Sequence, residues 1–141
     1  MKISYLLIAS LLISFVCISC EEKPTEREIL FDEVMDIHDT CMPEVVTLNQ
    51  IKRSLRKSKE DIKGDSVTVS KINTTIGAIE KANEGMMVWM RELVIPKDID
   101  PDEKVVPYLK EEKIKIKKVS DAMFEALDDG NALLKDIKDK Q

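Results

Sequence analysis

Apolar residues recur every three or four positions through three long stretches of this chain, and this spacing constrains the fold more than any other feature. It places the apolar side chains on one face of an α-helix. In the first stretch, Thr25 and Glu28 have the form of a capping box at a helix N-terminus. The apolar positions that follow are Leu30, Val34, Ile37, Cys41, Val45, Leu48, Ile51, Leu55 and Ile62. They predict a helix over about residues 26–62, which Pro43 either kinks or restarts.

Gly64, Asp65 and Ser66 provide a turn and a new helix start ahead of the second stretch. The gaps in its stripe alternate between three and four residues without exception. The members are Val69, Ile72, Ile76, Ile79, Asn83, Met86, Met90 and Leu93. Asn83 is the one polar member, and Pro96 closes the helix.

The third stretch opens on Asp100-Pro101-Asp102-Glu103, which supplies a cap, a proline at the first helical position and two acids in the first turn. The stripe is Val105, Leu109, Glu112, Ile116, Val119, Met123, Ala126, Gly130, Leu133 and Ile137. Only Glu112 and Gly130 interrupt its apolar character. Pro107 leaves two possible helix starts, one near residue 101 and one at Pro107 itself.

Three helices joined by short links predict an all-α protein, an up-down-up antiparallel three-helix bundle with heptad-like packing over residues 26–141. With 4 Gly and 5 Pro in 141 residues, the chain is too poor in turn residues for a sandwich, a barrel or a doubly wound sheet. The first helix is acidic and then basic, whereas the third is basic and then acidic. If these two helices run parallel, opposite charges meet at both ends.

Residues 1–19 have the pattern of a signal peptide, because Lys2 precedes an uncharged apolar run over residues 3–18. That run is shorter than the roughly 20 residues of a straight membrane-spanning helix. Ser19 before Cys20 resembles the lipobox of bacterial lipoproteins, although Cys17 stands where Leu or Val is usual. The resemblance implies cleavage before Cys20 and a lipid on its sulfur. An ordinary secretory signal or an uncleaved anchor is the alternative.

Residues 20–25 then form a flexible tether, and the acidic pair Glu21-Glu22 resembles the export signal of surface lipoproteins in Bacteroidota. We therefore expect a protein of the bacterial cell envelope that is held to the outer membrane by its N-terminal lipid, on the periplasmic or the surface face. Once Cys17 has left and Cys20 is modified, Cys41 is the one remaining thiol, so the mature domain has no intrachain disulfide.

The composition argues against most catalytic and binding chemistry. A net charge of −5 argues against nucleic acid as a partner. His38 is the only histidine, which excludes multi-histidine zinc sites and the paired Glu-x-x-His motifs of di-iron bundles. The four glycines are scattered singly, so no phosphate-binding loop is present. We expect no catalysis and no cofactor.

Two functions from different classes remain. The first is a non-catalytic module, monomeric or weakly homo-oligomeric, that binds an unknown protein through apolar residues outside the stripes, such as Met87, Val94 and Phe124. The second is a carrier of copper(I) or a small ligand. Counting back from the predicted turns places one group of soft donors in one layer, namely His38, Met42, Met86 and Met90. Methionine at heptad positions is also ordinary core filling.

The same count places Asn83 and Glu112 at one height on the second and third helices. A buried amide or carboxylate without a partner costs on the order of 1–3 kcal/mol. We therefore predict that Asn83 and Glu112 form a hydrogen bond and fix the register of the helices.

Several short motifs resemble a known family. They are His38-Asp39, Met42-Pro43, the segment 82–90 that ends Met86-Met87-Val88-Trp89-Met90, Tyr108-Leu109-Lys110-Glu111-Glu112, and Ala132-Leu133-Leu134. The family consists of small Bacteroidota lipoproteins often labelled "viral A-type inclusion protein" homologues. Thr40 departs from its usual His-Asp-Glu-x-Met-Pro motif. The resemblance implies a helical, lipid-anchored protein and assigns no activity.

Overall fold

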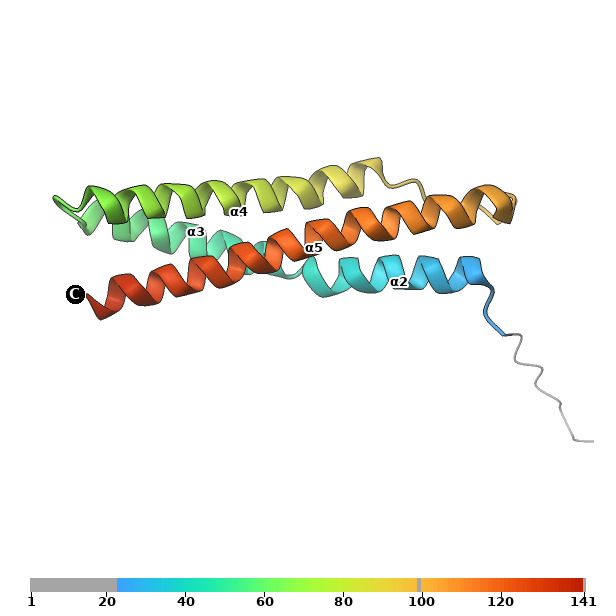
Figure 1. Ribbon diagram of the computed structural model, residues 1–141, viewed down its shortest axis with the longest axis horizontal. Coiled ribbons are helices and arrows are strands. Elements are labelled where there is room, and N and C mark those ends of the chain that lie inside the picture. Colours follow the sequence, from blue (N-terminus) through green and yellow to red (C-terminus); the bar gives the residue numbers. More distant parts are fainter. Residues whose placement is uncertain (1–22, 99, 141) are drawn as a thin grey trace, which may run out of the picture.

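The computed structural model describes residues 23–98 and 100–140. Within these ranges the chain forms no strand and four helices, which are α2 (Glu26–Cys41), α3 (Glu44–Asp61), α4 (Ser66–Glu92) and α5 (Asp102–Asp139) (Figure 1). The helices pack into a bundle, so the predicted all-α class is confirmed. The predicted signal peptide and Cys20 lie outside the described residues.

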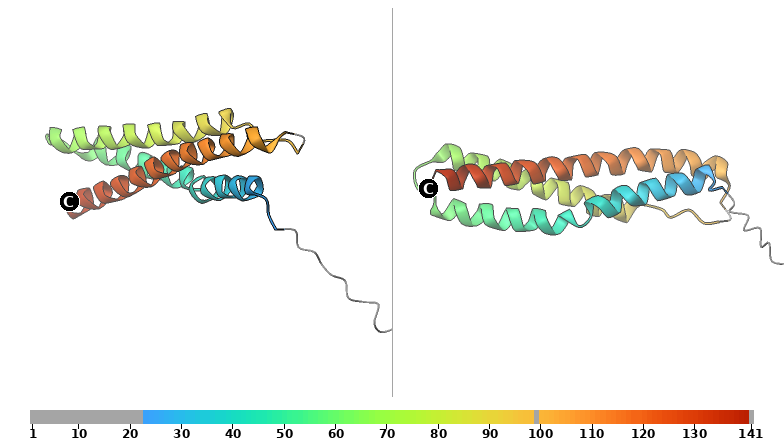
Figure 2. Two further views of the ribbon diagram at one scale, coloured as in Figure 1. Left: turned by 45° about the vertical axis from the view of Figure 1, so that its right-hand side comes forward. Right: turned by 90° about the horizontal axis from the view of Figure 1, so that it is seen from below.

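The longest helix, α5, contacts each of the other three. Its 38 residues span about 57 Å at the usual helical rise. In Figures 1 and 2, α2 and α3 follow one another along one side of α5, and α4 lies beside α3 and α5. The α4–α5 connection and the start of α2 lie at the same end of the bundle.

The segment predicted as one kinked or restarted helix forms two helices, because the helix is interrupted by a turn at Met42 and Pro43. Pro43 has no N–H to donate to the preceding turn, and α3 begins directly after it at Glu44. The capping box at the start of α2 is confirmed: the Glu28 amide donates to Thr25 Oγ1, and the Thr25 amide donates to Glu28 Oε2 at 2.7 Å. The hydrogen bond from the Thr25 amide is the main cause of a lowered Glu28 pKa.

The predicted start of α5 is wrong in its details. Pro101 is the N-cap residue and Asp102 the first helical residue. The carboxylate of Asp100 does not cap α5, because it accepts the Lys97 amide at 2.7 Å within the preceding turn. Pro107 lies inside α5, in its second turn, so of the two possible starts the earlier one holds and the carbonyl of Glu103 lacks its usual helical N–H donor.

Ion pairs confirm one half of the predicted charge pairing. Lys110 lies 2.7 Å from Glu26, and Lys113 lies 2.8 Å from Glu33, so the acidic part of α2 meets the basic part of α5. The basic part of α3 pairs differently, since Arg56 contacts Glu80 of α4 at 2.9 Å. These pairs are largely exposed and each contributes less than about 1 kcal/mol. These ion pairs therefore contribute little to the stability of the bundle, but they favour the observed pairing of helix faces over others.

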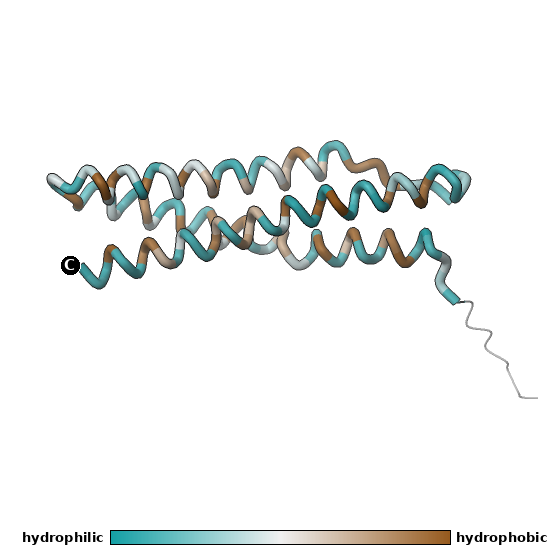
Figure 3. Tube along the Cα trace, in the orientation of Figure 1, coloured by the Kyte–Doolittle hydropathy of each residue, from teal (hydrophilic) through white to brown (hydrophobic). Residues whose placement is uncertain are grey.

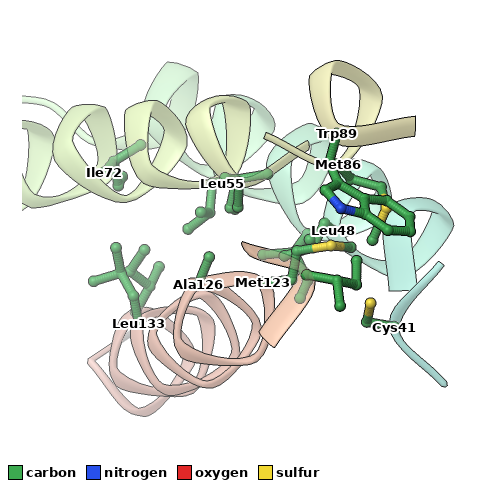
Figure 4. Packing of buried hydrophobic residues seen from close by; sticks show 14 of the residues in the cluster. Cys41, Leu48, Leu55, Ile72, Met86, Trp89, Met123, Ala126 and Leu133 are labelled. Atoms are coloured by element: carbon green, nitrogen blue, oxygen red, sulfur yellow. The ribbon is translucent and has the colours of Figure 1, made fainter. Parts of the chain in front are cut away.

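The apolar stripes of α2, α3 and α5 form most of the core (Figures 3 and 4). The stripe predicted for α4 is partly wrong. Ile72, Ile79 and Met86 are fully buried, but the second buried row lies one residue earlier than predicted. It consists of Thr68, Ala82 and Trp89 in place of Val69, Asn83 and Met90. Because α4 packs against both α3 and α5, its buried face is broader than one heptad stripe.

Candidate functional site

A buried carboxylate lies where α4 and α5 pack together near the α2–α3 break. Glu112 is 4% exposed, and its Oε2 accepts the indole N–H of Trp89 at 2.9 Å. Lys115 reaches the other oxygen, Oε1, at 2.7 Å. This hydrogen bond is the main cause of a raised pKa at Lys115. Both oxygens of the buried Glu112 carboxylate therefore have a partner, one from the core and one from the exposed side chain of Lys115.

The imidazole of His38 also lies beside the ring of Trp89. The two ring centroids are 5.7 Å apart with a tilt of 34°. His38 Nδ1 lies 2.8 Å from Asp39 Oδ1, and Nε2 lies 3.4 Å from the sulfur of Met90. In the neutral tautomer whose Nδ1–H donates a hydrogen bond to Asp39, the lone pair of Nε2 points toward that sulfur.

The thiol of Cys41 is fully buried in the same region. Its Sγ lies 3.6 Å from the carbonyl oxygen of His38. Burial raises the pKa of the thiol, against the opposing effect of a hydrogen bond with Ser120. Cys41 is therefore a neutral core residue at physiological pH. Figure 4 shows Met86 and Trp89 projecting from α4 toward this part of the core.

The structure brings together part of the soft-donor layer. His38 and Met90 are in contact, Met86 is fully buried in the core, and Met42 is half-buried against it. Within residues 23–98 and 100–140, no three His, Cys, Asp or Glu side chains gather as metal ligands would. The donors that face each other are one imidazole nitrogen and one thioether sulfur.

The predicted hydrogen bond between Asn83 and Glu112 is wrong. Glu112 binds Trp89 and Lys115, whereas the Asn83 amide lies 3.4 Å from Asn49 Oδ1 on α3. Asn83 Oδ1 is buried and has no hydrogen-bond partner in the described part of the chain.

The error comes from the register between α4 and α5. The Val94 amide donates to the hydroxyl of Tyr108 at 2.7 Å, so the start of α5 runs beside the connecting segment. Backbone geometry at Leu93 is already extended, and an extended residue advances about twice as far as a helical one. The prediction counted every residue of the connection as helical. It therefore paired each residue of α4 with a residue of α5 that lies several positions from its true neighbour.

A second feature is a groove along the outer seam of α4 and α5, which we call the α4–α5 groove. Three adjoining clefts of about 400, 400 and 420 Å³ form it. Lys71 and Asp136 line one end, and Glu92 and Lys115 line the other. From residue 71 to residue 92 the groove is about 31 Å long at the usual helical rise.

All five alanines of the described chain line this groove. They are Ala78, Ala82, Ala122, Ala126 and Ala132. Gly85 lines the same surface, so the seam lacks large side chains over much of its length. Sequence reasoning missed it, although alanine and glycine at positions 78, 82 and 85 follow the helical spacing of one face.

The apolar residues predicted to remain on the surface divide into two groups. Met87 and Val94 are exposed. Phe124 is not a free surface residue, because it packs against the main core. Its position beside the third stripe puts it at the edge of the buried face of α5. The exposed large apolar residues are Ile29, Val46, Val67, Met87, Val94, Ile95 and Ile114.

Comparisons with known proteins give no relative: no family model matches the chain, and neither curated proteins nor solved structures match it. None of the helices α2 to α5 is both long and apolar enough to cross a membrane.

Proposed function

We propose that the protein is a lipid-anchored module of the bacterial cell envelope that binds a helix of another protein in the α4–α5 groove and catalyses no reaction. One observation carries the proposal, namely that every alanine of the described chain lines this groove, with Ala78, Ala122 and Ala132 exposed in it and Ala82 and Ala126 buried at its floor. Alanines chosen for helix propensity alone would be scattered over all faces of the helices. Their concentration on one seam favours a role for that seam.

The dimensions of the groove suit a helix. Small side chains allow a second backbone to approach closely, and a helix of about 20 residues matches a length of about 31 Å. Amphipathic helices bind such grooves through apolar residues at positions i, i+3, i+4 and i+7. Lysines and acids alternate along both rims, among them Lys81, Lys118, Glu84 and Glu125. Mixed charges of this kind favour one register of the partner over others.

The anchor is part of the same proposal and is supported by the sequence alone, through the apolar run over residues 3–18 and the Ser19-Cys20 motif. The up-down-up order of three rods, with α2 and α3 as one rod, also belongs here. It is supported by pairs such as Lys59 with Asn73 between α3 and α4, and Lys113 with Glu33 between α5 and α2.

A photo-activated cross-linker at position 122 tests the groove in living cells. We expect it to capture one envelope protein and the bound residues to lie on a helix of that protein. Ala78→Arg should abolish the product, because it fills the facing wall of the groove with a charged side chain. The control is the same cross-linker at Ser54, an exposed position of α3. Equal products at positions 54 and 122, or a product that survives Ala78→Arg, would contradict the proposal.

Copper(I) binding is the second candidate, favoured by the contact of 3.4 Å between His38 Nε2 and Met90 Sδ. Nitrogen and sulfur ligands that share one tetrahedral metal ion lie roughly 3.5 Å apart, given metal–ligand bonds of about 2.0 and 2.3 Å. Both atoms are soft enough for copper(I). Trp89 beside them offers an aromatic face to a cation.

Competition against a chromophoric copper(I) chelator tests this candidate. We expect one ion per chain and at least a tenfold loss of affinity in His38→Ala, because the imidazole is the strongest donor present. Met87→Leu, at an exposed methionine one helical turn before Met90 that makes no contact with His38 of its own, is the control and should leave the affinity unchanged. Affinity that is indifferent to His38, or no binding at all, would eliminate the carrier function.

A further inference from the structure

The segment Leu93–Asp98, which we call the tip, carries two of the most exposed apolar side chains in the described chain. Val94 is 66% exposed and Ile95 is 65% exposed. The tip connects α4 to α5 at the end of the bundle where α2 begins (Figures 1 and 2). It lies away from the middle of the α4–α5 groove, so the helix-binding proposal does not explain its apolar surface.

Hydrogen bonds hold the backbone of the tip in place. The Val94 amide donates to the Tyr108 hydroxyl at 2.7 Å. Arg27 of α2 donates to the carbonyl oxygens of Lys97 and Asp100. The outward position of Val94 and Ile95 is therefore set by the fold, and no ordering of a loose loop is needed before these side chains bind something.

The N-terminal chain reaches the same place. Pro24 lines one cleft of about 510 Å³ together with Ile95 and Pro96. Cys20 precedes Pro24 by four residues, which span at most about 14 Å even when fully extended. A membrane attached at Cys20 is therefore held within about that distance of the cleft that Ile95 lines.

We propose that the tip inserts into the membrane interface, with Val94 and Ile95 buried among the lipid headgroups and the upper acyl chains. The proposal rests on the proposed anchoring at the N-terminus, which keeps the lipid surface at high local concentration beside the tip. Apolar side chains on a fixed backbone gain from burial at this depth without the need for an amphipathic helix. The bundle then stands with this end on the bilayer.

The charges at this end favour neutral lipid. Arg27 is occupied by two carbonyl oxygens and lies 3.5 Å from Asp102. Lys23, Lys97, Lys104 and Lys110 are accompanied by a larger number of acids, which are Glu26, Glu28, Asp98, Asp100, Asp102 and Glu103. Among the described residues at this end, acids therefore outnumber bases, which disfavours attraction to anionic headgroups, and insertion depends on apolar contact.

The test uses the full chain, purified from bacterial membranes in detergent and reconstituted into phosphatidylcholine vesicles. A polarity-sensitive fluorophore is attached to Ile95→Cys or, as the matched control, to Val67→Cys. Val67 is equally exposed, at 64%, but begins α4 at the opposite end of the bundle. Cys41 is fully buried and stays unlabelled in the folded protein.

We expect the emission of the label at position 95 to move to shorter wavelength on reconstitution, and that of the label at position 67 to stay in place. Replacing half of the phosphatidylcholine with anionic phosphatidylglycerol should leave the shift unchanged. A label at position 95 that remains in water while the protein floats with the vesicles would overturn the proposal. A wavelength shift at position 95 that appears only when envelope proteins are added would also overturn the proposal, since the tip would then bind a protein and not the lipid.

The lipid anchor is tested separately. The mass of the N-terminal peptide shows whether Cys20 carries a lipid, and the Cys20→Ala variant should no longer take up labelled palmitate. A chain that floats with an unmodified Cys20 contradicts the lipid anchor. The label at position 95 is then read in a chain that also carries Cys17→Ala and Cys20→Ala, so that no second accessible thiol takes the fluorophore. A chain that does not float with vesicles overturns both.

Discussion

Replacing Trp89 with Phe is expected to lower the free energy of unfolding by about 2–3 kcal/mol, because the buried carboxylate of Glu112 then loses its indole donor. Hydrogen bonds to charged groups contribute about 1.5–3 kcal/mol, and the phenyl ring keeps most of the packing. The contact is 2.9 Å long, and both residues are at most 5% exposed. Urea denaturation monitored by circular dichroism measures the change.

A double-mutant cycle separates the hydrogen bond from the packing. Glu112→Leu removes the carboxylate but leaves the indole N–H of Trp89 without an acceptor, so it should also destabilise. The double variant Trp89→Phe with Glu112→Leu removes both polar groups together. We expect a coupling energy of about 1.5–3 kcal/mol between the two sites. Strictly additive effects would show that the contact contributes nothing to stability.

Gly130→Ala is expected to destabilise the protein by about 1–3 kcal/mol, although alanine is the better helix former. A Cβ at position 130 would lie 2.5 Å from Ile51 Cγ2 and 3.6 Å from Ile79 Cδ1. At Gly130, α5 therefore packs too closely on α3 and α4 to leave room for a side chain. The added methyl must push Ile51 out of its position in a close-packed core.

Gly77→Ala is the matched control, because Gly77 also lies within a helix and a Cβ there meets nothing within 4 Å. This change should stabilise the protein by about 0.5–1 kcal/mol through reduced backbone entropy in the unfolded chain. The two Gly→Ala variants are thus expected to move the urea midpoint in opposite directions. A gain of stability in both would show that Ile51 yields freely to the new methyl.

The sequence was sufficient for the helices of this bundle, because local signals specify them. Thr25 and Glu28 form the capping box that their spacing indicates, and Pro43 ends a helix as its missing N–H requires. The burial of Glu112 also followed from its place in the third stripe. These features depend on residues at most a few positions apart.

Contacts between helices were harder to predict, since they depend on how far each connection advances the chain. The predicted hydrogen-bond partner of Glu112 was Asn83, whereas the actual partner is Trp89. The prediction failed because the chain is extended from Leu93 on and so advances farther than a helix would. The indole N–H was a usable signal, as a buried tryptophan needs an acceptor. Alanine carries no strong signal of its own, and the groove became visible only when α4 and α5 were seen side by side.

The break at Pro43 also determines how the bundle carries a mechanical load. A force applied near residue 23 enters through α2, which packs chiefly on α5 and is separated from α3 by the turn at Met42 and Pro43. Its further connections are small, such as the contact of His38 with Met90 and that of Arg27 with the carbonyl of Asp100. Under tension, we therefore expect α2 to separate from α5 as one unit, while α3, α4 and α5 keep their contacts with one another. If the N-terminus is anchored as proposed, a pull on the anchor is expected to release α2 before the α4–α5 groove is disturbed.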